Sequence, residues 1–179
     1  IKGQDNFKRV SRAPILERTN EEPFSSGSVF VMKEEKWKMW YTSFLRWGNE
    51  GEHKHYYVIK YAESEDGINW ERNNEICINI ESDEEYAIGK PSVIKLDGIY
   101  HMWYVYRGEQ YKIGYAHSID GKKWTRADQL SGIDVSETGW DSKAVSYPHV
   151  FIFKNYLYML YCGNDYGKEG LGLARKILT

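Results

Sequence analysis

Acidic residues precede three similar segments of this 179-residue chain, and carboxyl groups are the side chains best suited to acid–base chemistry. Acid pairs occupy residues 21–22 and 84–85, and a single acid, Asp141, follows Trp140. If the three leading loops converge, Asp141 is the candidate catalytic acid. The alternatives are solvated loops for the pairs and, for Asp141, a turn residue that caps its own backbone.

Hydrogen-bond donors follow these acids, at the start of two of the segments. Lys90 and Tyr147 each precede a proline, and His149 lies two residues after Tyr147. Lys90 and His149 are suited to donate hydrogen bonds to hydroxyl groups or to an anionic group. Arg107 follows an aromatic strand and is suited to clamp a carboxylate. The alternatives are a half-buried strand position for His149 and a surface hairpin charge for Arg107.

Loops between paired strands supply further candidate binding residues. Trp47 and His55 lie in the longest such loop, residues 44–57, where a tryptophan could stack on a ligand. Asn164 lies in the matching loop near residue 164 and is either a binding contact or a turn former. His53 and His55 have the spacing of metal ligands, but no third ligand has diagnostic spacing, so we expect no metal and no cofactor.

Three copies of one pattern position these residues. An aromatic strand with a Met-x-Tyr core occurs at residues 37–41 (WKMWY), 100–104 (YHMWY) and 157–161 (LYMLY). A second strand follows at residues 59–64 (IKYAES), 113–118 (IGYAHS) and 171–174 (LGLA). After the first two copies comes an Asp-Gly turn that ends in tryptophan, typical of a tight hairpin.

A third element enters each copy, and a gapless alignment matches residues 20–29, 84–93 and 141–150. Repeated antiparallel units without helix predict an all-β fold, an incomplete β-propeller of three antiparallel blades in a single domain. The blades are expected at approximately residues 20–72, 84–126 and 141–174. Residues 7–10 are expected to be a stray outer strand, because Phe7-Lys8-Arg9 resembles residues 70–72 and 124–126.

Composition narrows the function classes. The formal net charge of -2 argues against nucleic acid held by a broad basic field. No apolar run approaches the roughly 18 residues of a membrane helix. No leader sequence is evident, so we expect a cytoplasmic protein that contacts no membrane and keeps its two cysteines reduced.

An arc of three blades exposes apolar flanks, because propellers typically close with 4 to 8 blades. Large exposed apolar faces usually mark an interaction surface. We therefore expect a homodimer or a higher homo-oligomer, in which one arc can complete another.

The repeats resemble a known group of proteins. Residues 61–70 (YAESEDGINW) and 115–124 (YAHSIDGKKW), with 38–41 (KMWY) and 139–142 (GWDS), look like the five-bladed β-propeller glycosidase superfamily. That superfamily includes family 43 glycoside hydrolases, arabinanases, levansucrases and invertases. The resemblance covers about residues 7–174 and corresponds to the C-terminal three blades.

The resemblance implies oligosaccharide as the partner, with catalytic carboxylates on the innermost strands. Glycoside cleavage needs two such groups beside the bond. At the positions before the inner-strand proline, however, the gapless alignment places Ser26, Lys90 and Tyr147. Lys143 stands where relatives carry an acid after Gly-Trp-Asp-Ser, and it joins the candidate substrate-binding residues.

Three functions remain open. The first is carbohydrate recognition without turnover, and the second is a glycoside hydrolase completed by self-association or by a partner chain. The third is a protein-assembly module. We rank recognition first, because acids are missing where the family needs them.

Overall fold

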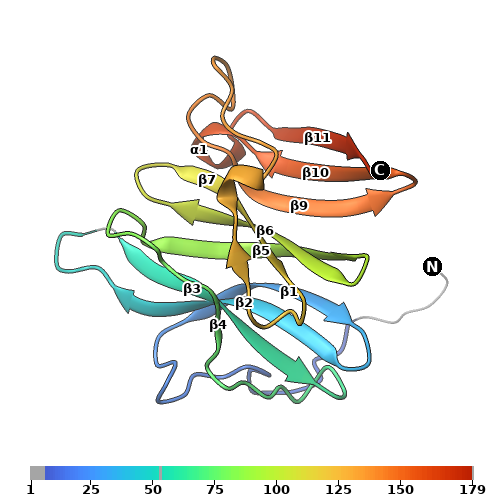
Figure 1. Ribbon diagram of the computed structural model, residues 1–179. Helices are drawn as coiled ribbons and strands as arrows, with labels where there is room; N and C mark the ends of the chain where they lie inside the picture. The colour runs from blue at the N-terminus through green and yellow to red at the C-terminus, as the bar shows by residue number, and fades with distance from the viewer. Residues whose placement is uncertain (1–6, 53, 179) are drawn as a thin grey trace.

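The computed structural model describes residues 7–52 and 54–178, which form three successive blades of mainly antiparallel strands (Figure 1). Blade 1 has the strand order β1-β2-β3, and a short strand, β4, also pairs with β3. Its strands are β1 (Ser26–Lys33), β2 (Trp37–Trp47), β3 (His55–Ser64) and β4 (Ile76–Ile78).

Two further blades follow. The second blade is joined to the first by a parallel pairing of Tyr57 with Ala87, so that the two blades form one eight-stranded sheet, and the third blade is a separate three-stranded sheet. Blade 2 consists of β5 (Ala87–Leu96), β6 (Ile99–Arg107), β7 (Tyr111–Ser118) and β8 (Thr125–Arg126). Blade 3 consists of β9 (Ser146–Phe153), β10 (Tyr156–Cys162) and β11 (Leu171–Ile177). Among the described residues the helical elements are a 3-10 turn, η1 (Asp128–Leu130), and a short helix, α1 (Asn164–Gly167). The predicted all-β fold with three antiparallel blades is confirmed.

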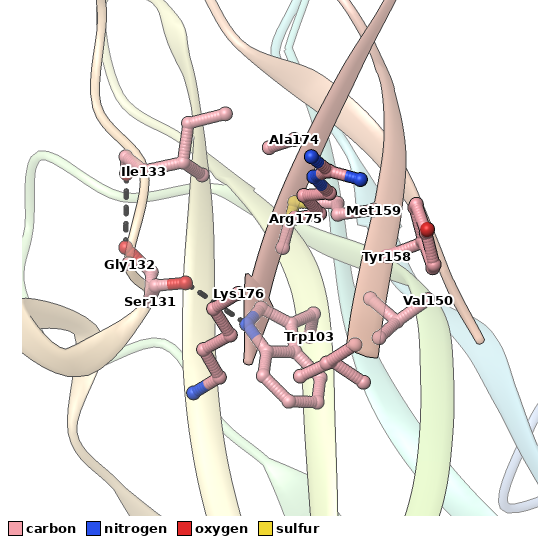
Figure 2. Close-up of a pocket in the computed structure, with 11 residues that line it drawn as sticks. Trp103, Ser131, Gly132, Ile133, Val150, Tyr158, Met159, Ala174, Arg175 and Lys176 are labelled. Atoms are coloured by element: carbon pink, nitrogen blue, oxygen red, sulfur yellow. Dashed lines mark hydrogen bonds between the residues drawn. The ribbon is translucent and has the colours of Figure 1, made fainter. Parts of the chain in front are cut away.

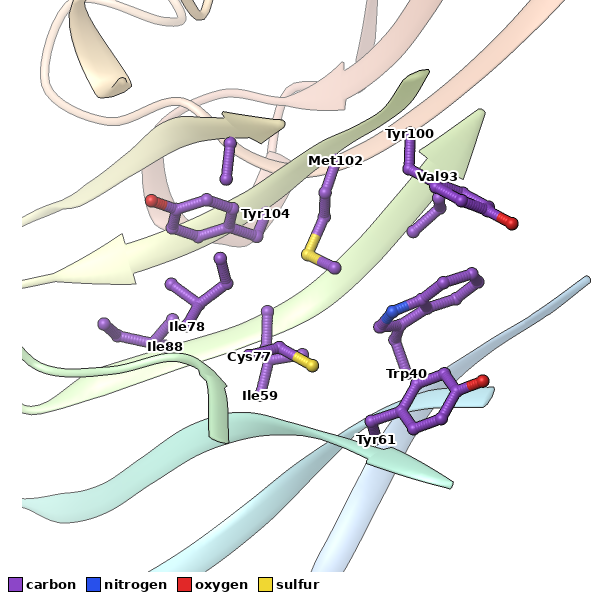
Figure 3. Packing of buried hydrophobic residues seen from close by; sticks show 11 residues of the cluster. Trp40, Ile59, Tyr61, Cys77, Ile78, Ile88, Val93, Tyr100, Met102 and Tyr104 are labelled. Carbon is purple, nitrogen blue, oxygen red and sulfur yellow. The ribbon is translucent and has the colours of Figure 1, made fainter. Parts of the chain in front are cut away.

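The Met-x-Tyr strand is the middle strand of each blade, and its alternation builds the core. In β6, Met102 and Tyr104 face blade 1 and belong to one core cluster with Trp40 and Ile59 of that blade (Figure 3). Trp103, between them in sequence, faces blade 3 and meets Met159. Successive side chains of a strand point to opposite faces, so one aromatic strand serves two interfaces.

The Asp-Gly turns form as expected and contribute to these interfaces. Gly67 and Gly121 have φ values of 76° and 78°, which glycine adopts without strain. Gly121 O accepts hydrogen bonds from Trp124 Nε1 at 2.9 Å and from Trp40 Nε1 at 2.7 Å. The turn of blade 2 therefore satisfies a buried indole of blade 1.

Strand register corrects the gapless alignment of the first blade by two residues. Val31, Val93 and Val150 each pair with the methionine of the middle strand. Ser28, not Ser26, is therefore equivalent to Lys90 and Tyr147. A bulge or irregularity interrupts the pairing at this point in each blade.

The outer strands are less regular than the sequence predicts. Glu71 forms an isolated bridge with Glu63, whereas Thr125 and Arg126 form the short β8. Residues 7–10 form no strand and are exposed. In blade 3, β11 is an edge strand, because the order is β11-β10-β9.

Candidate functional site

The three bulges bring the inner strands of all three blades to one cavity. We call it the three-blade cavity; it has a volume of about 300 Å³ and is open to solvent. Its lining residues are Ser25, Ser26, Gly27, Ser28, Thr42, Phe44, Tyr57, Gly89, Lys90, Val105, Tyr111 and Tyr147. The predicted binding residues Lys90 and Tyr147 thus share one site.

Backbone conformation marks the bulges. Ser28, Lys90 and Tyr147 have φ values of 40°, 53° and 54°, in the left-handed region that non-glycine residues rarely adopt. Such a conformation costs on the order of 1–3 kcal/mol and is concentrated at functional sites. The same strained position in all three blades indicates that packing around the cavity enforces it.

Close approach of blades 1 and 2 accounts for the glycine beside Lys90. A Cβ atom on Gly89 would lie 2.7 Å from Thr42 Oγ1 and 3.2 Å from the Tyr57 ring. The backbone amide of Lys90 donates a long hydrogen bond of 3.4 Å to Thr42 Oγ1. At this point the backbone of Gly89 and Lys90 in blade 2 therefore packs directly against the Thr42 hydroxyl of blade 1.

Tyrosine rings form one side of the cavity. The hydroxyl groups of Tyr57 and Tyr111 lie 3.1 Å apart, and the Tyr111 and Tyr147 ring centroids are 6.1 Å apart. Burial, with the hydrogen bond to Tyr111 second, raises the pKa of Tyr57. The Tyr57 hydroxyl therefore remains protonated, and it can donate a hydrogen bond to a ligand or accept one.

Arg107 supports this tyrosine wall from behind. Its guanidinium carbon lies 4.8 Å from the centre of the Tyr111 ring, and Nη1 donates to the Tyr166 hydroxyl at 3.3 Å. Its Nε atom is buried and has no hydrogen-bond partner among residues 7–52 and 54–178. Arg107 thus places a positive charge next to the site without lining it.

The three-blade cavity contains no carboxylate among the residues described as lining it. Lys90 is its one charged lining residue, and the other polar groups are hydroxyl groups and backbone atoms. Such a set can hold sugar hydroxyls or an anion. It lacks the pair of carboxyl groups that glycoside hydrolysis uses.

Asp141, the predicted catalytic acid, lies elsewhere. It is 6% exposed, does not line the cavity, and accepts a hydrogen bond of 2.9 Å from the Tyr161 hydroxyl. Burial and that hydrogen bond raise the pKa of Tyr161 to about 12. Through this hydrogen bond Asp141 links the segment that precedes β9 to β10, the middle strand of blade 3.

Trp47 and His55 face each other across β2 and β3, with ring centroids 5.1 Å apart. Trp47 also contacts Phe44 at 5.3 Å, and Phe44 lines the three-blade cavity. Trp47 and His55 therefore continue the aromatic surface of the cavity beyond Phe44. His53 lies outside the described residues.

Trp47, His55 and Arg107 lie near the cavity without lining it, and three further predicted binding residues are not brought to it. Asn164 Oδ1 accepts from the backbone amides of Lys143 and Ala144, so it is a turn former. The Lys143 side chain is exposed. His149 is exposed on β9 and packs beside Phe151.

Sequence reasoning missed Tyr57, Tyr111 and Thr42. Tyr57 and Tyr111 occur near the start of the third strand of their blades, just before the repeated Tyr-Ala segments. This equivalent position in two blades was the sequence signal that could have identified Tyr57 and Tyr111 as site residues.

In the described part of the chain no three His, Cys, Asp or Glu side chains form a group that could hold a metal ion. No helix in that part is long and apolar enough to cross a bilayer.

Solved structures identify the class of fold. A protein described as "Glycoside hydrolase" superposes on 91% of this chain and 50% of its own, with a TM-score of 0.72 and 20% identity. Zg3597, a family 117 glycoside hydrolase from Zobellia galactanivorans, gives a TM-score of 0.68 at 19% identity over 90% of this chain and 55% of its own. The structural neighbours are propeller glycoside hydrolases of the family 43, 117 and 32 types, which confirms the predicted resemblance at the level of fold.

Comparison of sequences gives relatives with higher identity than the solved structures. The chain is 38% identical over 169 residues to the uncharacterized protein Rv1502 of Mycobacterium tuberculosis, covering 94% of this chain and 56% of the relative. It is 29% identical over 141 residues to a 1,2-beta-oligomannan phosphorylase of Thermoanaerobacter, covering 76% of this chain and 48% of the relative. The chain thus spans about half the length of the curated relatives it matches. No family model matches it.

Proposed function

We propose that the three-blade cavity binds an oligosaccharide and that this chain alone does not cleave it. The observation that carries the proposal is the composition of the cavity: tyrosine rings, hydroxyl groups and one lysine, with no carboxylate among the described lining residues. The relatives with a named activity act on carbohydrates, which supports a saccharide as the ligand class.

The arrangement suits a sugar for physical reasons. Rings of Tyr111 and Tyr147 offer apolar faces to the C–H groups of a pyranose, while the hydroxyls of Tyr57 and Thr42 and the ammonium group of Lys90 offer hydrogen bonds. Ligand sites of this size usually combine apolar walls with a few convergent polar groups. Phe44 and Trp47 extend the apolar wall away from Lys90.

The test measures binding of a panel of oligosaccharides, β-1,2-mannosides included, by calorimetry. Lys90→Met removes a charged hydrogen bond, and we expect affinity to fall at least about 10-fold. Lys143→Ala is the matched control, because Lys143 is an exposed lysine outside the cavity, and affinity should not change.

Two results would overturn the proposal. Failure of every saccharide to bind would leave the assembly module as the better explanation. Turnover of a chromogenic glycoside by this chain, lost in Asp141→Asn, would instead favour a hydrolase completed by self-association.

A further inference from the structure

Blade 1 and blade 2 each contain the same kind of contact, in which a tyrosine of the middle strand and an arginine bind one carboxylate. The Tyr41 hydroxyl donates to Glu22 at 2.8 Å, and Arg72 Nη1 donates to the same carboxylate at 3.2 Å. In blade 2 the Tyr104 hydroxyl donates to Asp128 at 2.5 Å, and Arg126 Nη2 donates to Asp128 at 2.6 Å. Each contact consists of a tyrosine, a carboxylate and an arginine from the outer segment of the blade.

Blade 3 has two parts of this contact. Tyr161 is equivalent to Tyr41 and Tyr104, and its hydroxyl donates to Asp141. Within residues 7–52 and 54–178 no lysine, arginine or histidine forms an ion pair with Asp141. A buried carboxylate is stabilised by a charged partner, so this position favours an incoming arginine.

A cavity of about 70 Å³, open to solvent, lies on the face of blade 3 that carries Tyr161, and Figure 2 shows its lining. In blade 2 the aromatic residue two before the arginine, Trp124, packs against Trp40 and Tyr100, with ring centroids 6.1 and 6.5 Å away. By strand register the equivalents of Trp40 and Tyr100 are Trp103 and Leu157, and both line this cavity.

The strand next to the cavity is β11, the edge of its sheet. In blade 2 the outer strand pairs with β7 at Ala116, opposite Arg126. The equivalent of Ala116 in β11 is Ala174, which lines the cavity. A strand carrying an aromatic-x-Arg sequence can therefore meet three features at once: the edge of β11, the cavity and Asp141.

We infer that this strand is residues 7–10 of a second copy of the chain, with Phe7 in the cavity and Arg9 paired with Asp141. Phe7-Lys8-Arg9 has the spacing of Trp124-Thr125-Arg126, and both Phe7 and Arg9 are exposed. Arg9 forms no ion pair among the described residues. In this arrangement one copy provides the cavity and Asp141, and the other copy provides Phe7 and Arg9 to fill the cavity and pair with the carboxylate.

The fold favours a second copy over the same chain. Leu16 packs on the far face of blade 1 against Met39 and Tyr41, and Arg72 binds the backbone oxygen of Glu17. These contacts fix Leu16 and Glu17, which follow Arg9 closely in the sequence, on blade 1, at the opposite end of the three blades from β11 (Figure 1). Two copies related by a two-fold axis exchange the segment twice.

Sedimentation equilibrium tests the inference with single variants and with a mixture. We expect the wild type to form a dimer of twice 21.1 kDa, and Arg9→Ala or Asp141→Asn to raise the dimer dissociation constant at least about 30-fold. Lys8→Ala is the matched control, with a change below about 3-fold. Mixing Arg9→Ala with Asp141→Asn should restore dimers, because each mixed dimer retains one intact Arg9–Asp141 contact.

Three results would refute the inference: a monomeric wild type, a dimer that Arg9→Ala leaves unchanged, or a mixture that fails to recover. The last result would indicate closure by the same chain. If Asp141→Asn does not fold by circular dichroism, Ala174→Phe, which fills the cavity, replaces it in the mixture. Saccharide binding at the three-blade cavity is measured separately, so the two proposals fail independently.

Discussion

Glu34 provides a quantitative test of how blades 1 and 2 are held together. It lies in the β1–β2 turn, and its carboxylate is 2.6 Å from Lys95 Nζ of blade 2 and 3.1 Å from Lys38 Nζ. The Tyr100 hydroxyl also donates to it. Burial alone would raise the pKa of Glu34, but hydrogen bonds from Lys95, Tyr100 and Lys38 outweigh it and lower the pKa from 4.5 to about 2.

The magnitude follows from linkage between protonation and folding. A pKa of about 2 in place of 4.5 corresponds to about 3 kcal/mol of folding free energy at neutral pH. The side chain is 26% exposed, and screening by solvent reduces this to about 2 kcal/mol. Because the folded-state pKa is the lower one, this stability is fully present above about pH 4.5 and is lost as the pH falls toward about 2.

Glu34→Gln should therefore lower the free energy of unfolding by about 2 kcal/mol near pH 7 and by almost nothing near pH 2. Urea unfolding followed by tryptophan fluorescence measures this difference across the pH range. Glu35→Gln is the control, because Glu35 is the exposed neighbour in the same turn. A deficit that is independent of pH, or no deficit at all, would refute the reasoning.

Two further substitutions test the packing of the blades. Glu22→Gln leaves the ammonium group of Lys60, which is 3% exposed, without its carboxylate, and should cost about 3 kcal/mol in urea unfolding; a loss below about 1 kcal/mol would mean that water compensates the charge. Gly114→Ala places a Cβ atom 2.6 Å from the Tyr104 ring and should cost about 1–3 kcal/mol, whereas Gly27→Ala meets no atom within 4 Å and should cost less than about 1 kcal/mol. Equal melting temperatures for the two glycine variants would contradict the predicted contact.

Local patterns made the blades predictable. Alternation in the Met-x-Tyr strands, such as residues 100–104, and the positive φ of Gly67 and Gly121 depend on neighbours a few residues away. Lys90 and Tyr147 were predicted as site residues for the same reason, because each precedes the proline of an inner strand. Both line the three-blade cavity, whereas His149, which was predicted by the same reasoning, does not.

The tertiary structure decided what depends on contacts between distant segments. Tyr57 and Tyr111 are 54 residues apart, and their meeting depends on how blade 1 packs against the blades that follow it. The pairing of the inner strand with the methionine of the middle strand, and not the local sequence, shows that Ser28 is the equivalent of Lys90 and Tyr147.

Asp141 shows the same division most clearly. The sequence determined that an acid leads into blade 3, but packing against Tyr161 decided that the acid is buried as a structural contact. A side chain's residue type is local information, whereas its burial depends on segments brought together only when the blades assemble.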